Sequence, residues 1–378
     1  MMTDTKKRLI ILTIVVKILI ILVIYLASNL LPFNNYLHDI NFVYPRNEAI
    51  TIETAYKTWD GQLFIFLAEN GYSPNHPSNA FCPLWPFLIQ FYNKFTLGNS
   101  LISGIILSNI FSVIGILFLF EFLKKRFNEK IAYLSSLFLL VFPTSFYFSL
   151  IYAESLFFML TMIFLYYLYE NKFTPAFLAG ILLPLTKPQG SLIILPLLTY
   201  LFLKSYQGKL QFKFGKNCFL VLSIIIGFAA HLLIMRLTTG NFLSSFEAQK
   251  LYIAGASISN FFHPVSWFFR NFIQINFAVH DYIHSIIDRL FFAFFLFSLY
   301  LIYKNLDKTL FVYSLALGLL PALSENFLMS YSRFLLLVFP IFVVLAIKYE
   351  KHRNEIIITS AMLQTLFLIM HSLNYWVG

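Results

Sequence analysis

Apolar runs, each about as long as a bilayer is thick, recur along this chain and constrain its fold more than any other feature. Of the 378 residues, 59% are hydrophobic and only 12% are charged. A helix needs roughly 20 mainly apolar residues to cross the hydrocarbon core of a membrane. Soluble domains carry about 25% charged residues. The sequence therefore predicts an all-α polytopic membrane protein.

The apolar runs predict about 11 transmembrane helices, packed into one multi-span bundle that makes residues 1–378 a single integral domain. The first run is too long for the core of a signal peptide and has no small-residue cleavage site after it, so we expect a retained span. The predicted spans are 9–31, 99–123, 131–149, 153–169, 174–187, 189–203, 217–236, 286–303, 309–323, 334–347 and 356–372.

The basic residues predict which side of the membrane each loop faces. The formal net charge is +10, and most of the 27 Lys and Arg residues lie in segments that would be cytoplasmic with the N-terminus inside. Membrane proteins keep Lys and Arg on that side, which is a better explanation of the charge than nucleic-acid binding. Two long aromatic segments, 32–98 and 237–285, then face away from the cytoplasm, and we expect interfacial helices in both. Cys82 and Cys218 fall on opposite sides and cannot pair.

A segment with an acid, several amides and four prolines, residues 58–87, stands apart from the spans. We expect a helix over 51–70, ended by Gly71 in a left-handed conformation. Glu53 and Asp60 are seven residues apart and would share one face of that helix. Asp60 suits either of two roles, a general base near the membrane surface or an exposed interfacial acid.

The prolines after this helix predict an extended chain, because proline restrains its own φ and biases the preceding residue away from the α conformation. They are Pro74, Pro77, Pro83 and Pro86. Hydrogen-bonding side chains typical of sugar contacts lie among them: Tyr72, Asn75, His76 and Asn79. We expect a substrate-binding loop, and a rigid surface loop is the alternative, above all for His76.

Four further charged positions lie near span ends on the same, non-cytoplasmic side. They are Glu154, Lys187 in a turn with Gln189, Asp288 beside Arg289, and Arg333. Charges near hydrocarbon cost a few kcal/mol unless they are paired or face a wet cavity. We therefore expect a common polar cavity, with salt bridges between span ends as the alternative, especially for Asp288 and Arg289. Arg333 and Lys187 suit a phosphate, one as a fork and one as a point charge.

Several kinds of site are missing from the sequence. It contains no Walker loop, no dinucleotide glycine fingerprint, no HExxH motif and no Cys/His cluster with metal-ligand spacing. Nothing in it indicates ATP-driven transport or a nicotinamide cofactor. We expect no cofactor and no essential metal.

Four blocks of sequence, in order along the chain, resemble the PIG-V family, the second mannosyltransferase of GPI-anchor synthesis, and its prokaryotic relatives. The most specific block pairs WDGQLFIFLAENGY with AFCPLWP, which resembles the family's Trp-Asp and AFxPxxP signature. The other blocks are FPTSFYFSLIYAESLFFML, LTTGNFLSSFEAQ and SYSRFLLLVFPIF. The glycine after Trp-Asp and the short chain are more typical of a prokaryotic member.

This resemblance implies a GT-C glycosyltransferase whose site opens away from the cytoplasm. It implies a polyprenyl- or dolichyl-phosphate-mannose donor, a glycolipid or glycan acceptor, and inversion at the anomeric carbon. Asp60, beside Trp59, would be the base. Arg333 and Lys187 would hold the donor phosphate. The remaining residues expected to bind substrate are Trp59, Tyr72, His76, Glu154, Gln189 and Asp288.

Two alternatives remain open from the sequence. One is a GT-C transferase that uses another lipid-phosphate sugar, because pocket shape decides the sugar. The other is a lipid or sugar transporter or flippase, a class that commonly shows inverted repeats and interrupted midplane helices. The sequence shows no such repeat. The membrane would be the plasma membrane in a prokaryote and the endoplasmic reticulum in a eukaryote.

Overall fold

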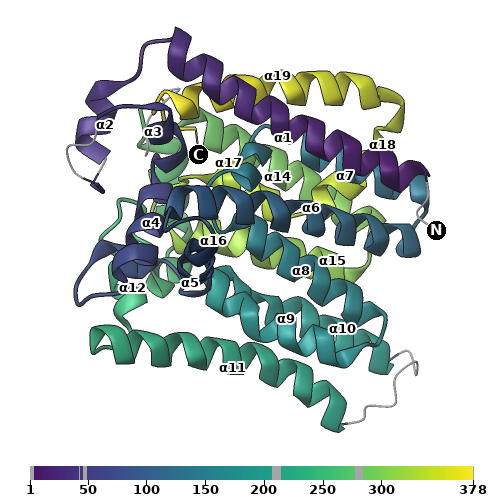
Figure 1. Ribbon diagram of the computed structural model, residues 1–378. Coiled ribbons are helices and arrows are strands. Elements are labelled where there is room, and N and C mark those ends of the chain that lie inside the picture. The colour runs from purple at the N-terminus through teal and green to yellow at the C-terminus, as the bar shows by residue number, and fades with distance from the viewer. Residues whose placement is uncertain (1–3, 42, 46–48, 207–213, 277–283, 378) are drawn as a thin grey trace.

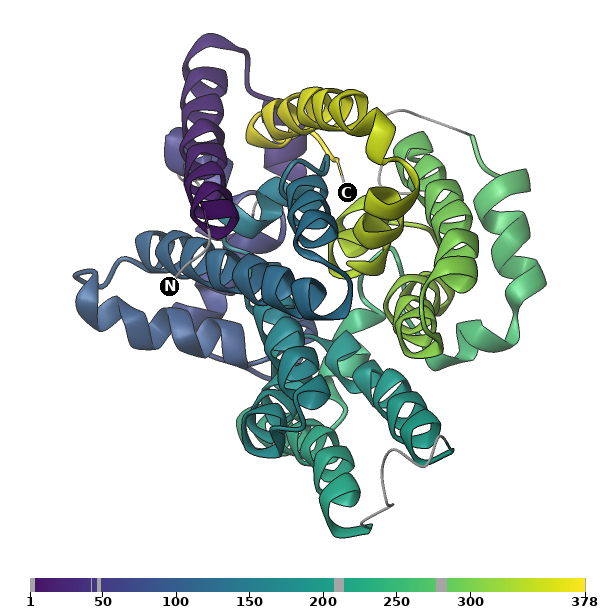
Figure 2. The same cartoon turned by 90° about the vertical axis from the view of Figure 1, so that its right-hand side faces the viewer.

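In a computed structural model, the chain is described over residues 4–41, 43–45, 49–206, 214–276 and 284–377. Every regular element in these ranges is a helix. Figure 1 shows the elements gathered into one bundle, in which α1 and α19, from opposite ends of the chain, run side by side. Figure 2 shows the green helices of the later part of the chain on the side opposite purple α1.

The helices of the first half are α1 (Asp4–Leu30), α2 (Asn35–Asn41), α3 (Ile52–Lys57), α4 (Asp60–Asn70), η1 (Pro77–Ala80), α5 (Leu84–Tyr92), η2 (Asn93–Phe95), α6 (Ser100–Arg126), α7 (Glu129–Leu140), η3 (Ser145–Ser149), α8 (Glu154–Tyr169) and α9 (Phe173–Thr186). Those of the second half are η4 (Pro188–Ile193), α10 (Ile194–Tyr206), α11 (Phe214–Thr239), α12 (Ser244–Gln249), η5 (Ile258–Phe262), α13 (Pro264–Phe268), η6 (Phe269–Ile273), α14 (Ile286–Asn305), α15 (Lys308–Ser314), η7 (Leu315–Leu319), α16 (Leu320–Ser324), α17 (Tyr331–Phe334), η8 (Leu335–Leu337), α18 (Pro340–Lys348), η9 (Glu350–His352) and α19 (Arg353–Ser372).

Five of the described helices are long and apolar enough to cross a bilayer: α1, α6, α11, α14 and the segment ending in α19. A sixth span results if the pair 331–337 and 340–348, bent by 80°, is counted as one. Much of the surface of these helices is apolar and exposed, as on α1 at Ile11 and Ile18. This is the surface that a helix presents to lipid. The chain is therefore an all-helical multi-span membrane protein.

Helices occupy each of the eleven predicted spans, but not all of them reach the length of a span. The helices at 154–169, 173–186 and 308–324 are apolar but short. The predicted span 131–149 is broken: α7 ends at Leu140, shortly before Pro143. Proline lacks the N–H that would continue the helical hydrogen bonds, so the chain turns there. By length and composition, five or six of the described helices qualify as spans, so the predicted number of about 11 stays a prediction.

The break after α7 lies in the core, where every residue from 141 to 153 is buried. Backbone carbonyls that leave a helix inside a membrane protein need other partners. Side chains from neighbouring helices supply them: Gln364 donates to Leu140 and Phe142, Lys17 to Phe148, Ser108 to Leu150 and Asn109 to Ser149. Lys17, a charge within the first span, is thus buried against this break, where it also donates to the Ser149 hydroxyl at 3.1 Å.

The predicted single helix over 51–70 is wrong, because the structure divides it into α3 and α4. Trp59, between them, has φ 56° and ψ −125°, which no helix allows. Glu53 and Asp60 therefore do not share a helix face, and Glu53 instead lies 3.4 Å from Lys57. Gly71 follows α4 with φ 71°, the positive value expected for it.

The two long segments predicted to face away from the cytoplasm contact each other. α12 of the second packs on η1 of the first. Across this contact the Asn79 amide donates to the Ser244 hydroxyl at 3.1 Å, and the Gln249 amide donates to the Ala80 carbonyl at 3.0 Å. The Tyr252 hydroxyl donates to the Pro77 carbonyl at 3.2 Å. The proline-rich loop is thus held between α4 and α12.

Candidate active site

The break at Trp59 makes Asp60 the first residue of α4. The N-terminus of a helix carries partial positive charge, which favours a carboxylate in that position. The glycine that follows is required by close packing: a Cβ on Gly61 would lie 2.9 Å from the Tyr56 carbonyl oxygen. The Trp-Asp-Gly sequence therefore places an acid at a helix start, where α3 and α4 turn sharply against each other.

Thr58 fastens this turn to two other parts of the chain. Its carbonyl accepts a hydrogen bond of 3.0 Å from the Tyr152 hydroxyl. Its own hydroxyl lies 3.0 Å from Nε2 of His371, a buried residue on α19. The position of Asp60 thus depends on contacts with the buried break before α8 and with the last long helix.

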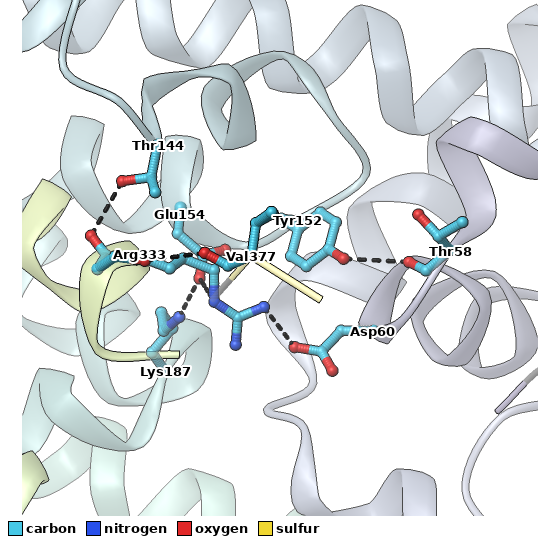
Figure 3. A network of polar contacts seen from close by, with 9 residues as sticks. Thr58, Asp60, Thr144, Tyr152, Glu154, Lys187, Arg333 and Val377 are labelled. Carbon is cyan, nitrogen blue, oxygen red and sulfur yellow. Dashed lines mark hydrogen bonds and ion pairs between the residues drawn. The ribbon is translucent and has the colours of Figure 1, made fainter. Parts of the chain in front are cut away.

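Glu154, the first residue of α8, lies between two cations. Its side chain is 2% exposed, and Oε1 is 2.7 Å from Lys187 Nζ and 3.4 Å from Arg333 Nε. Arg333 also donates from Nη1 to Asp60 Oδ2 at 2.8 Å. Figure 3 shows the resulting line of four charged groups, Asp60–Arg333–Glu154–Lys187, which we call the charged network. Its formal charges sum to zero.

Aromatic rings enclose the centre of the charged network. The Arg333 guanidinium lies 5.4 Å from the Tyr147 ring centroid and 5.3 Å from that of Tyr152. Contacts of this kind attract a cation to the ring face and exclude water. Of the four charged side chains, Asp60 is the most exposed at 24%. A molecule that enters the site therefore reaches the Asp60 carboxylate most easily.

A sharp turn after α9 aims Lys187 at Glu154. Lys187 is extended, with φ −149° and ψ 150°, as expected for a residue before proline. Three residues on, the N–H of Gly190 donates to the Lys187 carbonyl at 2.9 Å. A Cβ on Gly190 would lie 2.2 Å from the carbonyl carbon and oxygen of Leu183 in α9. The Lys-Pro-Gln-Gly sequence therefore needs both its proline and its glycine.

Gly190→Ala should destabilise the protein and displace Lys187. Because backbone atoms meet the added methyl group, the turn must shift, at a cost of about 1–3 kcal/mol typical of overpacking. Thermal unfolding of the detergent-solubilised protein measures the loss. Ser191→Ala is the control in the same turn and should unfold with the wild type. Equal unfolding temperatures for Gly190→Ala and wild type would show that α9 yields at Leu183.

A cavity of about 440 Å³ opens beside the charged network. This volume lies in the range of about 300–1,000 Å³ typical of small-molecule sites. Five residues expected at the site line it: Asp60, Glu154, Lys187, Gln189 and Arg333. The structure adds Gln249, Tyr252, Glu325 and Trp376, which the sequence did not single out for the site. Glu325 is an acid near a predicted span end, so the signal that pointed to Glu154 was available for it.

Other residues expected to bind substrate lie outside the cavity lining. The Tyr72 hydroxyl donates to the Phe81 carbonyl, and burial raises the pKa of Tyr72. His76 stacks on Phe66 and contacts Ser78, and burial lowers its pKa. Both side chains therefore stabilise the loop in this structure.

Asp288 and Trp59 are also placed by packing. Asp288 is fully buried, and its Oδ1 accepts from the Ser332 N–H at 3.1 Å, next to Arg333. The buried ring of Trp59 lies edge-on against Trp376, 4.8 Å between centroids. Asp288 thus positions the segment that carries Arg333, and Trp59 contacts a cavity wall.

Cysteine and metal chemistry also bear on the site. Cys82 lines the cavity, and burial raises the pKa of its thiol to about 12, so it is protonated at neutral pH. Cys82 and Cys218 are both free thiols. Among the described residues, no group of three or more His, Cys, Asp or Glu side chains has the arrangement of a metal site. The two carboxylates of the charged network are bound to protein cations.

Residues 75–234 match the family model of dolichyl-phosphate-mannose-protein mannosyltransferases. The match includes Glu154 and Lys187. It covers less than half of the chain and is consistent with the predicted activity, a membrane glycosyltransferase that depends on a lipid-phosphate sugar. The matching family is described differently from PIG-V, so the narrower resemblance remains a prediction. No curated protein matches the chain.

Two solved structures of the oligosaccharyltransferase of the archaeon Archaeoglobus fulgidus are similar to the chain. One, AglB with an inhibitory peptide and dolichol-phosphate, has a TM-score of 0.48 and 13% identity, over 97% of this chain and 56% of that one. The other, with zinc and sulfate, has a TM-score of 0.47 and 15% identity, over 96% and 53%. The chain spans about half the length of these structures.

Proposed function

We propose that this protein transfers mannose from a polyprenyl- or dolichyl-phosphate-mannose donor to a hydroxyl group of a glycolipid or glycan acceptor, with inversion at the anomeric carbon. The observation that carries the proposal is a cavity lined by the Asp60 carboxylate together with two cations, Arg333 and Lys187. The family match over residues 75–234 supports the donor class.

Asp60 is the base in this proposal. Its Oδ2 accepts from Arg333, which orients the carboxylate, and its Oδ1 accepts no hydrogen bond from the described residues. Oδ1 takes the proton of the acceptor hydroxyl as the acceptor oxygen attacks the anomeric carbon. The bond from that carbon to the phosphate oxygen breaks on the opposite side, and the lipid phosphate leaves with the bonding electrons.

Arg333 and Lys187 stabilise the negative charge that grows on the leaving phosphate. Glu154 holds both cations before the donor arrives, at 3.4 and 2.7 Å. This preorganisation matters because two unpaired cations in a buried site would repel each other and lose hydration. Lysine has three N–H donors and arginine has five. The contacts with Glu154 and Asp60 use some of these, and the others can bind phosphate oxygens.

The donor's long apolar chain has a place to bind between α10 and α11. These helices form an apolar groove of about 610 Å³, lined by Leu198, Leu201, Phe202, Ser205, Cys218, Val221 and Leu222. Nearer the active site, η4 and α11 line the polar cavity through Leu192, Phe228 and His231. A polar cavity and an apolar groove that share α11 suit an amphipathic ligand.

Leu222→Trp, which fills the groove, should raise the KM for a long-chain polyprenyl-phosphate-mannose several-fold. A donor with only two isoprene units should be used as before, because its chain ends before the groove. Ile225→Trp, an exposed apolar position on α11 outside the groove lining, is the matched control. Equal effects of Leu222→Trp on both donors would place the lipid chain elsewhere.

Transfer by the purified protein tests the proposal directly. The protein is reconstituted with lipid-phosphate-linked mannose or glucose and offered glycolipid, glycan or serine-containing peptide acceptors. A mannosylated glycolipid or glycan supports the proposal and its PIG-V-like acceptor. A mannosylated peptide moves the acceptor to protein, as in the name of the matching family. Lipid translocation without any glycosidic product overturns the proposal in favour of a flippase.

The proposal also specifies the side of the membrane on which the active site lies. The N-terminus lies in the cytoplasm and the cavity opens on the far side, within a single domain over 1–378 whose segments 32–98 and 237–285 form the outer part. A membrane-impermeant amine label applied to sealed cells tests this orientation. Labelling of Lys250, in the second segment, supports it, and labelling of Lys6 and Lys7 without Lys250 contradicts it.

A further inference from the structure

An acidic side chain outside the charged network also lines the cavity. Glu325 follows α16 directly and is half-buried. It lines the same cavity as Asp60 and Arg333. The mechanism above gives it no task. A carboxyl that lines a ligand cavity but takes no part in the proton transfer is a candidate for binding the ligand.

The backbone around Glu325 is held on both sides by the segment that follows α12. The Ser257 N–H donates to the Ser324 carbonyl at 2.8 Å, and the Asn326 N–H donates to the Ala254 carbonyl at 2.7 Å. Gly255, with φ 54°, permits the close approach, since a Cβ there would lie 2.4 Å from the Asn326 amide nitrogen. Glu325 therefore lies in a fixed bend.

Side-chain amides reinforce this bend. Asn260 donates to the Ser324 carbonyl at 2.6 Å, and Asn271 donates to the Asn326 carbonyl at 3.1 Å. Hydrogen bonds thus surround the Glu325 backbone and restrict where its carboxyl can point. Such restriction is what a binding residue requires, because a preorganised group loses little entropy when a ligand arrives.

Among the described residues, no cation forms an ion pair with the Glu325 carboxyl. The two cations of the cavity are already bound to Asp60 and Glu154. Burial raises the pKa of Glu325, and the negative charge of Asp288 raises it further, while Arg333 lowers it. A hydrogen bond from the Met329 backbone also lowers the pKa of this carboxyl. Carboxyl oxygens form hydrogen bonds with hydroxyl groups, so neighbouring hydroxyl groups of a sugar are suitable partners for Glu325.

Resting on the proposed function, we infer that Glu325 binds hydroxyl groups of the donor's sugar and so distinguishes a sugar-bearing lipid phosphate from a bare one. Tyr252, Ser257 and Ser330 also line the cavity. Together they offer the apolar face and polar partners that a hexose requires. Glu325 is thus a specificity-determining residue, separate from the groups that hold phosphate.

Equilibrium binding measurements distinguish recognition of the sugar from recognition of the phosphate, and they do not depend on catalysis. Dolichyl-phosphate-mannose and sugar-free dolichyl phosphate are titrated against the detergent-solubilised wild type, Glu325→Ala and Glu325→Gln. We expect Glu325→Ala to weaken binding of the mannose-bearing lipid about tenfold, in the range for the loss of one buried hydrogen bond, and to leave binding of the bare lipid unchanged. Glu325→Gln keeps a donor and an acceptor and should retain part of the preference.

Glu355→Ala, an exposed acid on α19, is the matched control and should bind both lipids as the wild type does. The inference is overturned if Glu325→Ala keeps the wild-type preference for the mannose-bearing lipid, or if it weakens both lipids equally. It is also overturned if the wild type has no such preference. A wild type that binds neither lipid would remove the proposed function together with this inference.

Discussion

Asp60→Asn should reduce mannosyl transfer by about 10²–10⁴-fold, the contribution typical of a positioned general base. Asparagine has nearly the same shape, but its amide cannot take the acceptor's proton. Its side-chain oxygen can still accept from Arg333, so the turn between α3 and α4 should persist. The kcat should therefore fall, and the KM for the donor should change little. Initial rates with the donor at saturation measure the effect.

Asp39→Asn is the control for the loss of an acid in the same segment, because Asp39 is 79% exposed and lies on α2. It should transfer mannose at the wild-type rate. Thermal unfolding of Asp60→Asn, compared with wild type, separates lost chemistry from lost structure. Full activity in a folded Asp60→Asn protein would exclude Asp60 as the base.

Glu154→Gln should destabilise the protein by about 3–5 kcal/mol, the usual cost of breaking a buried ion pair by removing one partner. The carboxylate is 2% exposed and touches both Lys187 and Arg333, so its loss leaves a buried net positive charge. The same substitution should weaken donor binding, because the cations repel each other and move apart. Thermal unfolding in detergent reports the first effect.

Two further variants test whether the loss of stability in Glu154→Gln comes from the burial of the ion pair. Glu129→Gln removes the acid of a half-buried pair that solvent still reaches, 2.6 Å from Lys124, and should cost only about 0–1 kcal/mol. The double variant Glu154→Gln/Lys187→Met removes both charges, and it should recover part of the lost unfolding free energy. A Glu154→Gln protein as stable as wild type would show that solvent reaches the charged network.

Hydrophobic pattern alone predicted where the helices lie, and it did so well because each apolar run is a local property of the chain. Helices stand at 100–126, 173–186 and 286–305, close to the predicted bounds. The pattern was less informative about continuity. The break at Pro143 and the turn at Trp59 both interrupt predicted helices, and Trp59 carries no local signal of its positive φ. Its conformation depends on Thr58 contacts with Tyr152 and His371.

For the candidate site, the sequence identified the charges but not their partners. A few kcal/mol per charge near hydrocarbon is reason enough to expect Glu154, Lys187 and Arg333 to meet in a polar cavity. The cost does not depend on which partner relieves it, so composition could not predict that Glu154 would hold both cations. For the same reason, the sequence could not predict that Asp288, which is equally costly to bury, accepts a hydrogen bond from the Ser332 backbone N–H and forms no part of the charged network.

By itself, the sequence determined a helical membrane protein with an acid at Asp60, cations at Lys187 and Arg333, and a resemblance that implied what they do. These are properties of short segments, set by hydrophobicity and by motifs of a few residues. Only the tertiary structure decided that these groups, up to 273 positions apart, form one charged network, and that Glu325 shares their cavity. Ion pairing in a low-dielectric interior acts through distances of a few ångströms, and the packing of the helices sets those distances.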